Sequence, residues 1–121
     1  MKAHTRRGIA YITGRLVSGK YSTTLRDDSE GKHFSFDGEA SLENGVSVYD
    51  YEQKCYIRGN NSGGPFSLYH DGNAKWIELT IEGNKFKGHD KDSGTFFSGT
   101  INGDFITVHD DEYSQDFKYL L

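Results

Sequence analysis

The stretch "GVSVYDYEQKCYIRGN", residues 45–60, is closely matched by "FITVHDDEYSQDFKYLL", residues 105–121. In both stretches apolar and polar side chains alternate, an acidic turn follows, and the alternation then resumes. Alternation with a period of two over about five to eight residues is typical of a β-strand with one buried face. Each stretch therefore predicts two strands joined by a turn, which is a β-hairpin.

The same unit occurs five times along the chain. Aligned on the residue that opens each turn, the rows are "TTLRDDSEGKHFSF" (23–36), "VSVYDYEQKCYIRG" (46–59), "FSLYHDGNAKWIEL" (66–79), "FKGHDKDSGTFFSG" (86–99) and "ITVHDDEYSQDFKY" (106–119). The aligned position is occupied by Asp27, Asp50, His70, Asp90 and Asp110. The last four of these residues are evenly spaced by 20 positions. Such a period indicates a repeat architecture with one hairpin as its unit.

The alternation also predicts which residues face each other across the turns. If Tyr49 lies opposite Tyr56, then Val48 lies opposite Ile57, and an inward residue meets an inward residue. The same register pairs further inward residues: Val46 with Gly59, Leu68 with Ile77, Val108 with Phe117, Gly88 with Phe97 and Phe86 with Gly99. A glycine opposite a phenylalanine matches side-chain volumes as a packed core requires.

Short turns connect each hairpin to the next. Two-residue hairpin turns, in which glycine readily adopts a positive φ, are expected at Ser18-Gly19, Gly83-Asn84 and Gly103-Asp104. They would join inward pairs: Leu16 with Tyr21, Ile81 with Phe86 and Ile101 with Ile106. The residues Glu43-Asn44-Gly45 fit a three-residue turn that joins Leu42 to Val46, and residues 59–65 form the longest connection.

The predicted fold is all-β. It is one domain over residues 1–121, an antiparallel meander of about ten to twelve strands built from hairpin repeats of about 20 residues. One side of the meander is apolar from Ile12 to Leu121, and a flat sheet would leave that side wet and two edges open. Closure into an up-and-down β-barrel removes both problems, and a two-layer sandwich is the second choice. Helices are not expected, because the 15 glycines and many aromatic residues favour strands and turns.

Composition narrows the classes of function. The formal net charge of −4 gives no general attraction to phosphate backbones, so no nucleic-acid partner is expected. The single cysteine, Cys55, allows no internal disulfide. No apolar run resembles a secretory signal or a membrane span of about 18 residues. We therefore expect a soluble protein of the cytoplasm that does not bind membranes, with its oligomeric state open and a dimer as one option.

Aromatic and imidazole side chains gather near the turns on the face opposite the core. We call them the outer belt: Tyr49, Tyr56, Tyr69, Trp76, His89, Phe96 and His109. They could simply be cross-strand pairs that stabilise their hairpins. They could also form a recognition surface, because Tyr and Trp are enriched at binding hot spots. The sequence thus predicts a non-catalytic binding module whose partner is a glycan or a protein.

The turn ends are rich in carboxylates, which allows two interpretations. Asp closes turns through its own side chain, whereas an open acidic rim would attract cations or a basic partner. No metal or cofactor is expected, because His89 and His109 lie on strands about 10 Å apart, separated by the strand of Phe96.

Catalysis is the alternative to binding. His109 faces Asp116 across its hairpin, but the pairing arithmetic aligns no serine or cysteine nucleophile with it, and no familiar catalytic motif is present. Two alternatives therefore stay open beside the binding module. One is a small hydrolase-like enzyme, and the other is a barrel that carries a small apolar ligand inside.

Overall fold

The computed structural model of the protein describes residues 1–61 and 64–121. Its elements in chain order are α1 (Ala3–Ser18), β1 (Thr24–Asp27), β2 (Lys32–Ser41), β3 (Gly45–Asp50), β4 (Cys55–Asn61), β5 (Phe66–His70), β6 (Lys75–Glu82), β7 (Lys85–Asp90), β8 (Thr95–Asn102), β9 (Phe105–Asp110) and β10 (Gln115–Leu120). The long connection expected at residues 59–65 includes positions 62 and 63, which lie outside the described residues.

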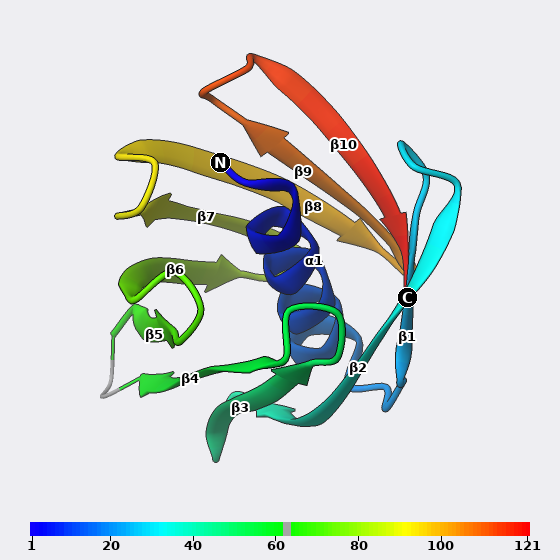
Figure 1. Ribbon diagram of the computed structural model, residues 1–121. Helices are drawn as coiled ribbons and strands as arrows, with labels where there is room; N and C mark the ends of the chain where they lie inside the picture. Colours follow the sequence, from blue (N-terminus) through cyan, green and yellow to red (C-terminus); the bar gives the residue numbers. More distant parts are fainter. Residues whose placement is uncertain (62–63) are drawn as a thin grey trace.

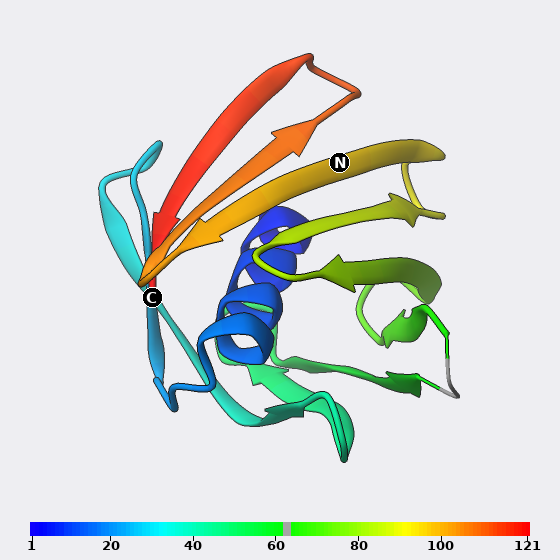
Figure 2. The same cartoon turned by 180° about the vertical axis from the view of Figure 1, so that it is seen from behind.

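The ten strands form a closed antiparallel barrel with α1 inside it (Figures 1 and 2). The strands follow one another around the barrel in chain order, and β1 pairs with β10 to close it. The predicted all-β up-and-down barrel is therefore confirmed. An even number of strands lets the first and the last run antiparallel where they meet.

The predicted register of the hairpins is also confirmed. Tyr49 lies opposite Tyr56, and the inward pairs are those expected: Val46 with Gly59, Val48 with Ile57, Leu68 with Ile77, Ile81 with Phe86, Gly88 with Phe97, Phe86 with Gly99, Ile101 with Ile106 and Val108 with Phe117. A Cβ atom on Gly88 would lie 2.4 Å from Cζ of Phe97. Only glycine leaves room for the ring there.

The prediction of a strand from Ile12 and a hairpin turn at Ser18-Gly19 is wrong, because α1 runs from Ala3 to Ser18. Gly19 ends α1 as a left-handed C-cap with φ 70°, and its N–H donates to the carbonyl of Arg15 at 3.0 Å. The glycine that was expected in a hairpin turn therefore serves as a helix stop. Leu16 lies on the helix and does not pair with Tyr21.

Helix α1 is buried along both faces, from Thr5 to Leu16. An apolar stripe marks a helix that has one face on the core, so an enclosed helix leaves no such pattern in the sequence. Glycine lets the strands approach, since a Cβ on Gly8 would lie 2.5 Å from Cδ1 of Ile57. The helix supplies much of the barrel core, including Ile9, Tyr11 and Ile12. Among the described residues, no helix combines the length and apolar character that crossing a membrane requires.

One turn also differs from its prediction by a single residue. Ser41 pairs with Gly45, and Ala40 pairs with Val46, so Leu42 is not the partner of Val46. Gly45 has a φ of 88° but already belongs to the strand ladder. The turn therefore begins at Leu42, which is 52% exposed.

Candidate functional site

The residues that open the five turns point into the barrel and are buried. We call them the inner ring: Asp27, Asp50, His70, Asp90 and Asp110. Oδ1 of Asp50, for example, accepts the N–H groups of Glu52 and Gln53 at 3.0 and 3.1 Å. This is the turn-closing role of aspartate, and it is confirmed for the ring carboxylates. They do not belong to an open acidic rim.

Two arginines of α1 meet the inner ring from inside. Nη1 of Arg6 lies 2.9 Å from Oδ2 of Asp110, and both side chains are buried. Arg7 contacts three carboxylates of the first two turns: Asp27 at 3.6 Å, Glu30 at 2.8 Å and Glu52 at 2.9 Å. Breaking a buried ion pair by removing one partner is strongly destabilising. The ring and the arginines therefore fix the helix in the barrel.

His70 is the one inner-ring residue that is not an aspartate. Its Nδ1 accepts the N–H of Asn73 at 3.1 Å, so a neutral imidazole closes this turn. Burial lowers the pKa of His70 below its ordinary 6.5, and nearby His4 lowers it further. Nε2 of His70 and Oδ2 of Asp90 have no hydrogen-bond partner among the described residues. Within the same residues, no group of three or more His, Cys, Asp or Glu side chains could hold a metal ion.

The outer belt lies on the outside of the barrel, and its members meet in cross-strand pairs. The aromatic and imidazole ring centres are 4.9, 5.0 and 4.5 Å apart in three pairs: Tyr49 with Tyr56, Tyr69 with Trp76 and His89 with Phe96. Nδ1 of His109 instead donates to Oδ1 of Asp116 at 2.7 Å. Aromatic pairs of this kind contribute about 0.5–1.5 kcal/mol beyond the area they bury.

The seven belt residues do not form one continuous row. Across the boundaries between hairpins their partners are polar: Arg58 opposite Tyr69, Glu78 opposite His89 and Ser98 opposite His109. Each pair is thus displaced by two residues from the pair before it, since the strands of a closed barrel are staggered. Belt residues of one hairpin therefore lie opposite each other, whereas belt residues of neighbouring hairpins do not.

A groove runs over the outside of β6 to β10. Two hollows of about 490 and 420 Å³ share Thr80, Lys87 and Ser98, and together we call them the outer groove. One end is lined mainly by polar side chains: Glu82, Lys85, Thr100, Thr107, His109 and Asp116. The other end contains the aromatic ring of Phe96. Its further lining residues include Pro65, Glu78, His89 and Asp111.

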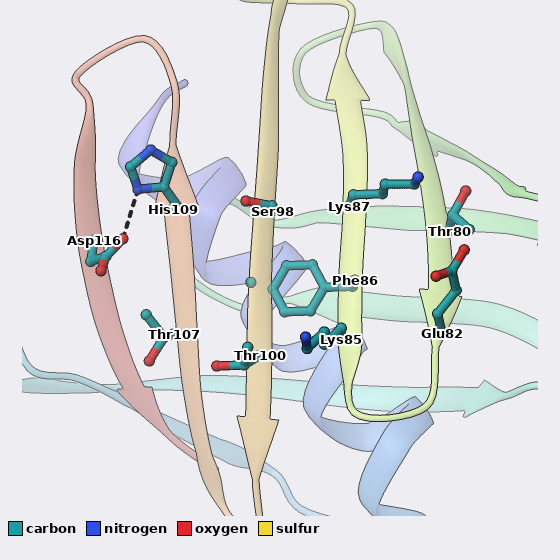
Figure 3. Close-up of a pocket in the computed structure, with 11 residues that line it drawn as sticks. Thr80, Glu82, Lys85, Phe86, Lys87, Ser98, Thr100, Thr107, His109 and Asp116 are labelled. Carbon is teal, nitrogen blue, oxygen red and sulfur yellow. Dashed lines mark hydrogen bonds and ion pairs between the residues drawn. The ribbon is translucent and has the colours of Figure 1, made fainter.

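Figure 3 shows how the polar end of the outer groove is built. Ser98 and Thr100 lie on β8, between the lysines of β7 and the side chains of β9. Short hydroxyl side chains therefore form the floor, and long lysine side chains border it. Lys85 and Lys87 make no ion pair with any described residue, so their ammonium groups stay available to a ligand.

Ser98, His109 and Asp116 stand in one row across β8, β9 and β10. Ser98 was not predicted as a site residue, although the Gly103-Asp104 turn that pairs Ile101 with Ile106 also places it opposite His109. In a catalytic triad, Nε2 of the histidine accepts the serine proton. Here Nε2 lies 3.5 Å from Oδ1 of Asp111, and no hydrogen bond joins Ser98 to His109 in the described part of the chain. The histidine is held between two carboxylates, away from the nucleophile.

Cys55 is the other candidate nucleophile. It is partly buried at the start of β4, and burial raises the pKa of its thiol. The reactive species of cysteine is the thiolate, which this environment disfavours.

The accessible candidate residues are therefore those of the outer belt and the outer groove, whereas the inner ring is enclosed. Sequence reasoning found the belt from the alternation but missed the groove, which is assembled from three hairpins. No protein-family model, curated protein or solved structure matches the chain.

Proposed function

We propose that the protein is a non-catalytic glycan-binding module that uses the outer groove and the neighbouring belt residues. The observation that carries the proposal is the continuity of the groove from hydroxyl side chains to an aromatic ring. Phe96 is 63% exposed at one end, where its ring is accessible to the apolar face of a sugar. Aromatic rings and a few well-placed polar groups are the usual components of ligand sites.

The polar groups of the groove suit sugar hydroxyls, which both donate and accept hydrogen bonds. Lys87 only donates, Glu78 only accepts, and Ser98 does both. Trp76 borders this area from β6, two residues before Glu78, and is 52% exposed. The core of a protein–protein interface is depleted of charged residues, so the groove favours a glycan over a protein partner.

The two alternatives find less support. A hydrolase built on Ser98 and His109 would need Nε2 of the histidine to turn from Asp111 toward the serine. A carrier of an apolar ligand would need space along the barrel axis, where α1 lies.

The proposal is tested by screening the protein on a glycan array and titrating the glycans it retains. Phe96→Ala and Lys87→Ala should each weaken binding by about tenfold or more, since truncation of a central contact residue costs over 1 kcal/mol. Phe105→Ala is the matched control, because Phe105 is 65% exposed but does not line the groove. An empty array, or binding that survives in Phe96→Ala, would reject the proposal.

A further inference from the structure

A separate hollow of about 460 Å³ lies over β2, β3 and β4. It is lined by Asp37, Gly38, Tyr49, Tyr51 and Tyr56, and we call it the tyrosine cage. Two of its tyrosines belong to the outer belt, but none of its residues lines the outer groove. The cage is therefore a second surface site with its own chemistry.

The three tyrosine rings form walls. The ring centre of Tyr49 lies 4.9 Å from those of both Tyr51 and Tyr56, with interplanar angles of 77° and 68°. Both neighbours thus stand nearly perpendicular to Tyr49. They are 53% and 43% exposed, so their rings are accessible from solvent.

Hairpin stabilisation does not account for the third ring. Tyr49 and Tyr56 are a cross-strand pair, whereas Tyr51 lies in the turn, outside the strand ladders of the described residues, and its N–H donates to the carbonyl of Ser35 at 3.2 Å. At the corresponding turn position the other hairpins carry charged residues: Asp28, Asp71, Lys91 and Asp111. Without Tyr51, this site would be one more cross-strand aromatic pair. Tyr51 supplies the third wall of the cage.

A fixed negative charge borders the rings. Asp37 of β2 lies opposite Tyr49, and its Oδ1 accepts the hydroxyl of Tyr21 at 2.5 Å and the N–H of Gly38 at 2.7 Å. These hydrogen bonds hold the pKa of Asp37 below its ordinary 3.8, so the carboxylate is ionised at neutral pH. Both bonds end on Oδ1, and Oδ2 has no hydrogen bond to a described residue.

We propose that the tyrosine cage binds the methylated ammonium group of an organic cation. Aromatic faces attract cations, and cages of several rings are suited to quaternary ammonium groups. A trimethylammonium group needs apolar walls and one compensating charge, and both are present here.

A cation of the protein itself already lies near one of these rings. The guanidinium carbon of Arg58 is 5.6 Å from the ring centre of Tyr56. Arg58 forms an ion pair with Asp71 at 2.8 Å and does not line the cage. The ring environment therefore attracts positive charge, and the hollow itself stays open to a ligand.

The test is a titration of the protein with tetramethylammonium chloride, followed by NMR at constant ionic strength. We expect saturable shifts centred on the amides of residues 37–38 and 49–56. Tyr51→Ala and Asp37→Asn should each weaken binding by about fivefold, and Tyr51→Phe should bind as the wild type does because it keeps the ring. Phe96→Ala in the outer groove should bind normally, which separates this site from the proposed glycan site.

A neutral probe distinguishes a cation site from a merely apolar one. Choline and its uncharged carbon analogue 3,3-dimethylbutanol have the same shape, and choline should bind at least about tenfold more tightly. Equal affinities, or shifts that persist unchanged in both Tyr51→Ala and Asp37→Asn, would overturn the proposal. The natural source of the group is then identified by comparing choline, a peptide with trimethyl-lysine and phosphatidylcholine vesicles. Binding of any of these through the cage supports the proposal, and failure of all three together with tetramethylammonium overturns it.

Discussion

Two aspartates of the inner ring have the same place in the repeat but different electrostatic surroundings. Oδ1 closes the turn in both, accepting an N–H at 3.0 Å in Asp110 and at 3.2 Å in Asp90. Oδ2 of Asp110 pairs with Arg6, while Oδ2 of Asp90 has no partner in the described part of the chain. The free energy that each carboxylate contributes to folding should therefore differ.

We expect Asp110→Asn to lower the free energy of unfolding by about 3 kcal/mol, because it leaves a buried guanidinium without its charge partner. Asp90→Asn makes the same chemical change and keeps the turn-closing oxygen, but it removes an unpaired buried charge. It should leave stability unchanged or raise it. Urea unfolding of both variants at neutral pH tests the difference, and equal losses would contradict it.

His70 should make stability sensitive to mild acid. Its pKa in the folded protein is lowered by burial, so below about pH 6.5 the unfolded chain binds a proton that the folded chain resists. The stability that depends on neutral His70 is present above its ordinary pKa of 6.5 and is lost as the pH falls. The slope reaches about 1.4 kcal/mol per pH unit at most.

The variant His70→Asn should lose less stability than the wild type between about pH 7 and about pH 5.5. Its amide oxygen replaces Nδ1 as the acceptor for Asn73, and it does not titrate. Burial raises the pKa of Asp50, which has the opposite sign, but Asp50 is present in both proteins. Denaturant unfolding across this pH range is the measurement, and parallel curves would argue against the role of His70.

Single positions differ in how well the sequence predicts them. The outward placement of Trp76 and Phe96 follows from alternation within one hairpin, which needs only local information. The partners of Ser98 and Asp37 lie on the neighbouring hairpin, and the short turns between the hairpins set the offset. The turn before β3 was predicted one residue too late, which displaced Asp37 from Tyr49 and concealed the cage, and the groove depends on side-chain packing over several strands that alternation does not describe.

Helix α1 is the element that the sequence did not predict, and its glycines are closely packed against the strands. A Cβ added at Gly8 would meet Cδ1 of Ile57 at 2.5 Å, and one added at Gly14 would meet Cδ1 of Ile106 at 3.0 Å. In a free helix, alanine is favoured over glycine by about 1 kcal/mol. The enclosing strands therefore oppose the intrinsic helix preference at Gly8.

A double-mutant cycle should detect this opposition. Gly8→Ala should be at least about 1 kcal/mol more favourable in an Ile57→Val background, which lacks Cδ1, than in the wild type. The matched control is Ile106→Val, which should not couple to Gly8→Ala because Ile106 faces Gly14. Thermal or urea unfolding of the four proteins gives the coupling energy, and additivity with Ile57→Val would disprove close packing there.

The hairpins were predictable as elements, and the helix was not. Within a hairpin, the turn and the alternation point to the same pairing, as Tyr49 and Tyr56 show. For α1, the surrounding barrel buries residues on all sides, so burial no longer selects a periodic pattern. The same Ser18-Gly19 pair is compatible with a hairpin turn and with a helix end.

For the molecule as a whole, closure depends on a narrow seam. Strands β1 and β10 are joined through two register pairs, Arg26 with Leu120 and Asp27 with Tyr119, and by one further bond from the N–H of Asp28 to the carbonyl of Lys118. The neighbouring strands β9 and β10 share six pairs. If the residues of α1 formed an additional strand, the strand count would be odd, and the first and last strands would run parallel where they meet.

Native-state hydrogen exchange should therefore begin at this seam. We expect the amides of β1 to exchange faster than those of β7 and β8, because opening the seam breaks few hydrogen bonds and leaves the other strands paired. Exchange measured by NMR at neutral pH gives the order directly. Equal protection of β1 and β8 would indicate that the barrel opens only by global unfolding.

The enclosed position of α1 also bears on the order of events during synthesis. Arg6 leaves the ribosome well before its partner Asp110, which follows 104 residues later. A 16-residue helix on its own is marginal in water. The residues of α1 therefore stay largely unstructured until the last hairpin has emerged. The barrel can therefore close only after β10 has been synthesised, when the last strands pack around a helix made long before them.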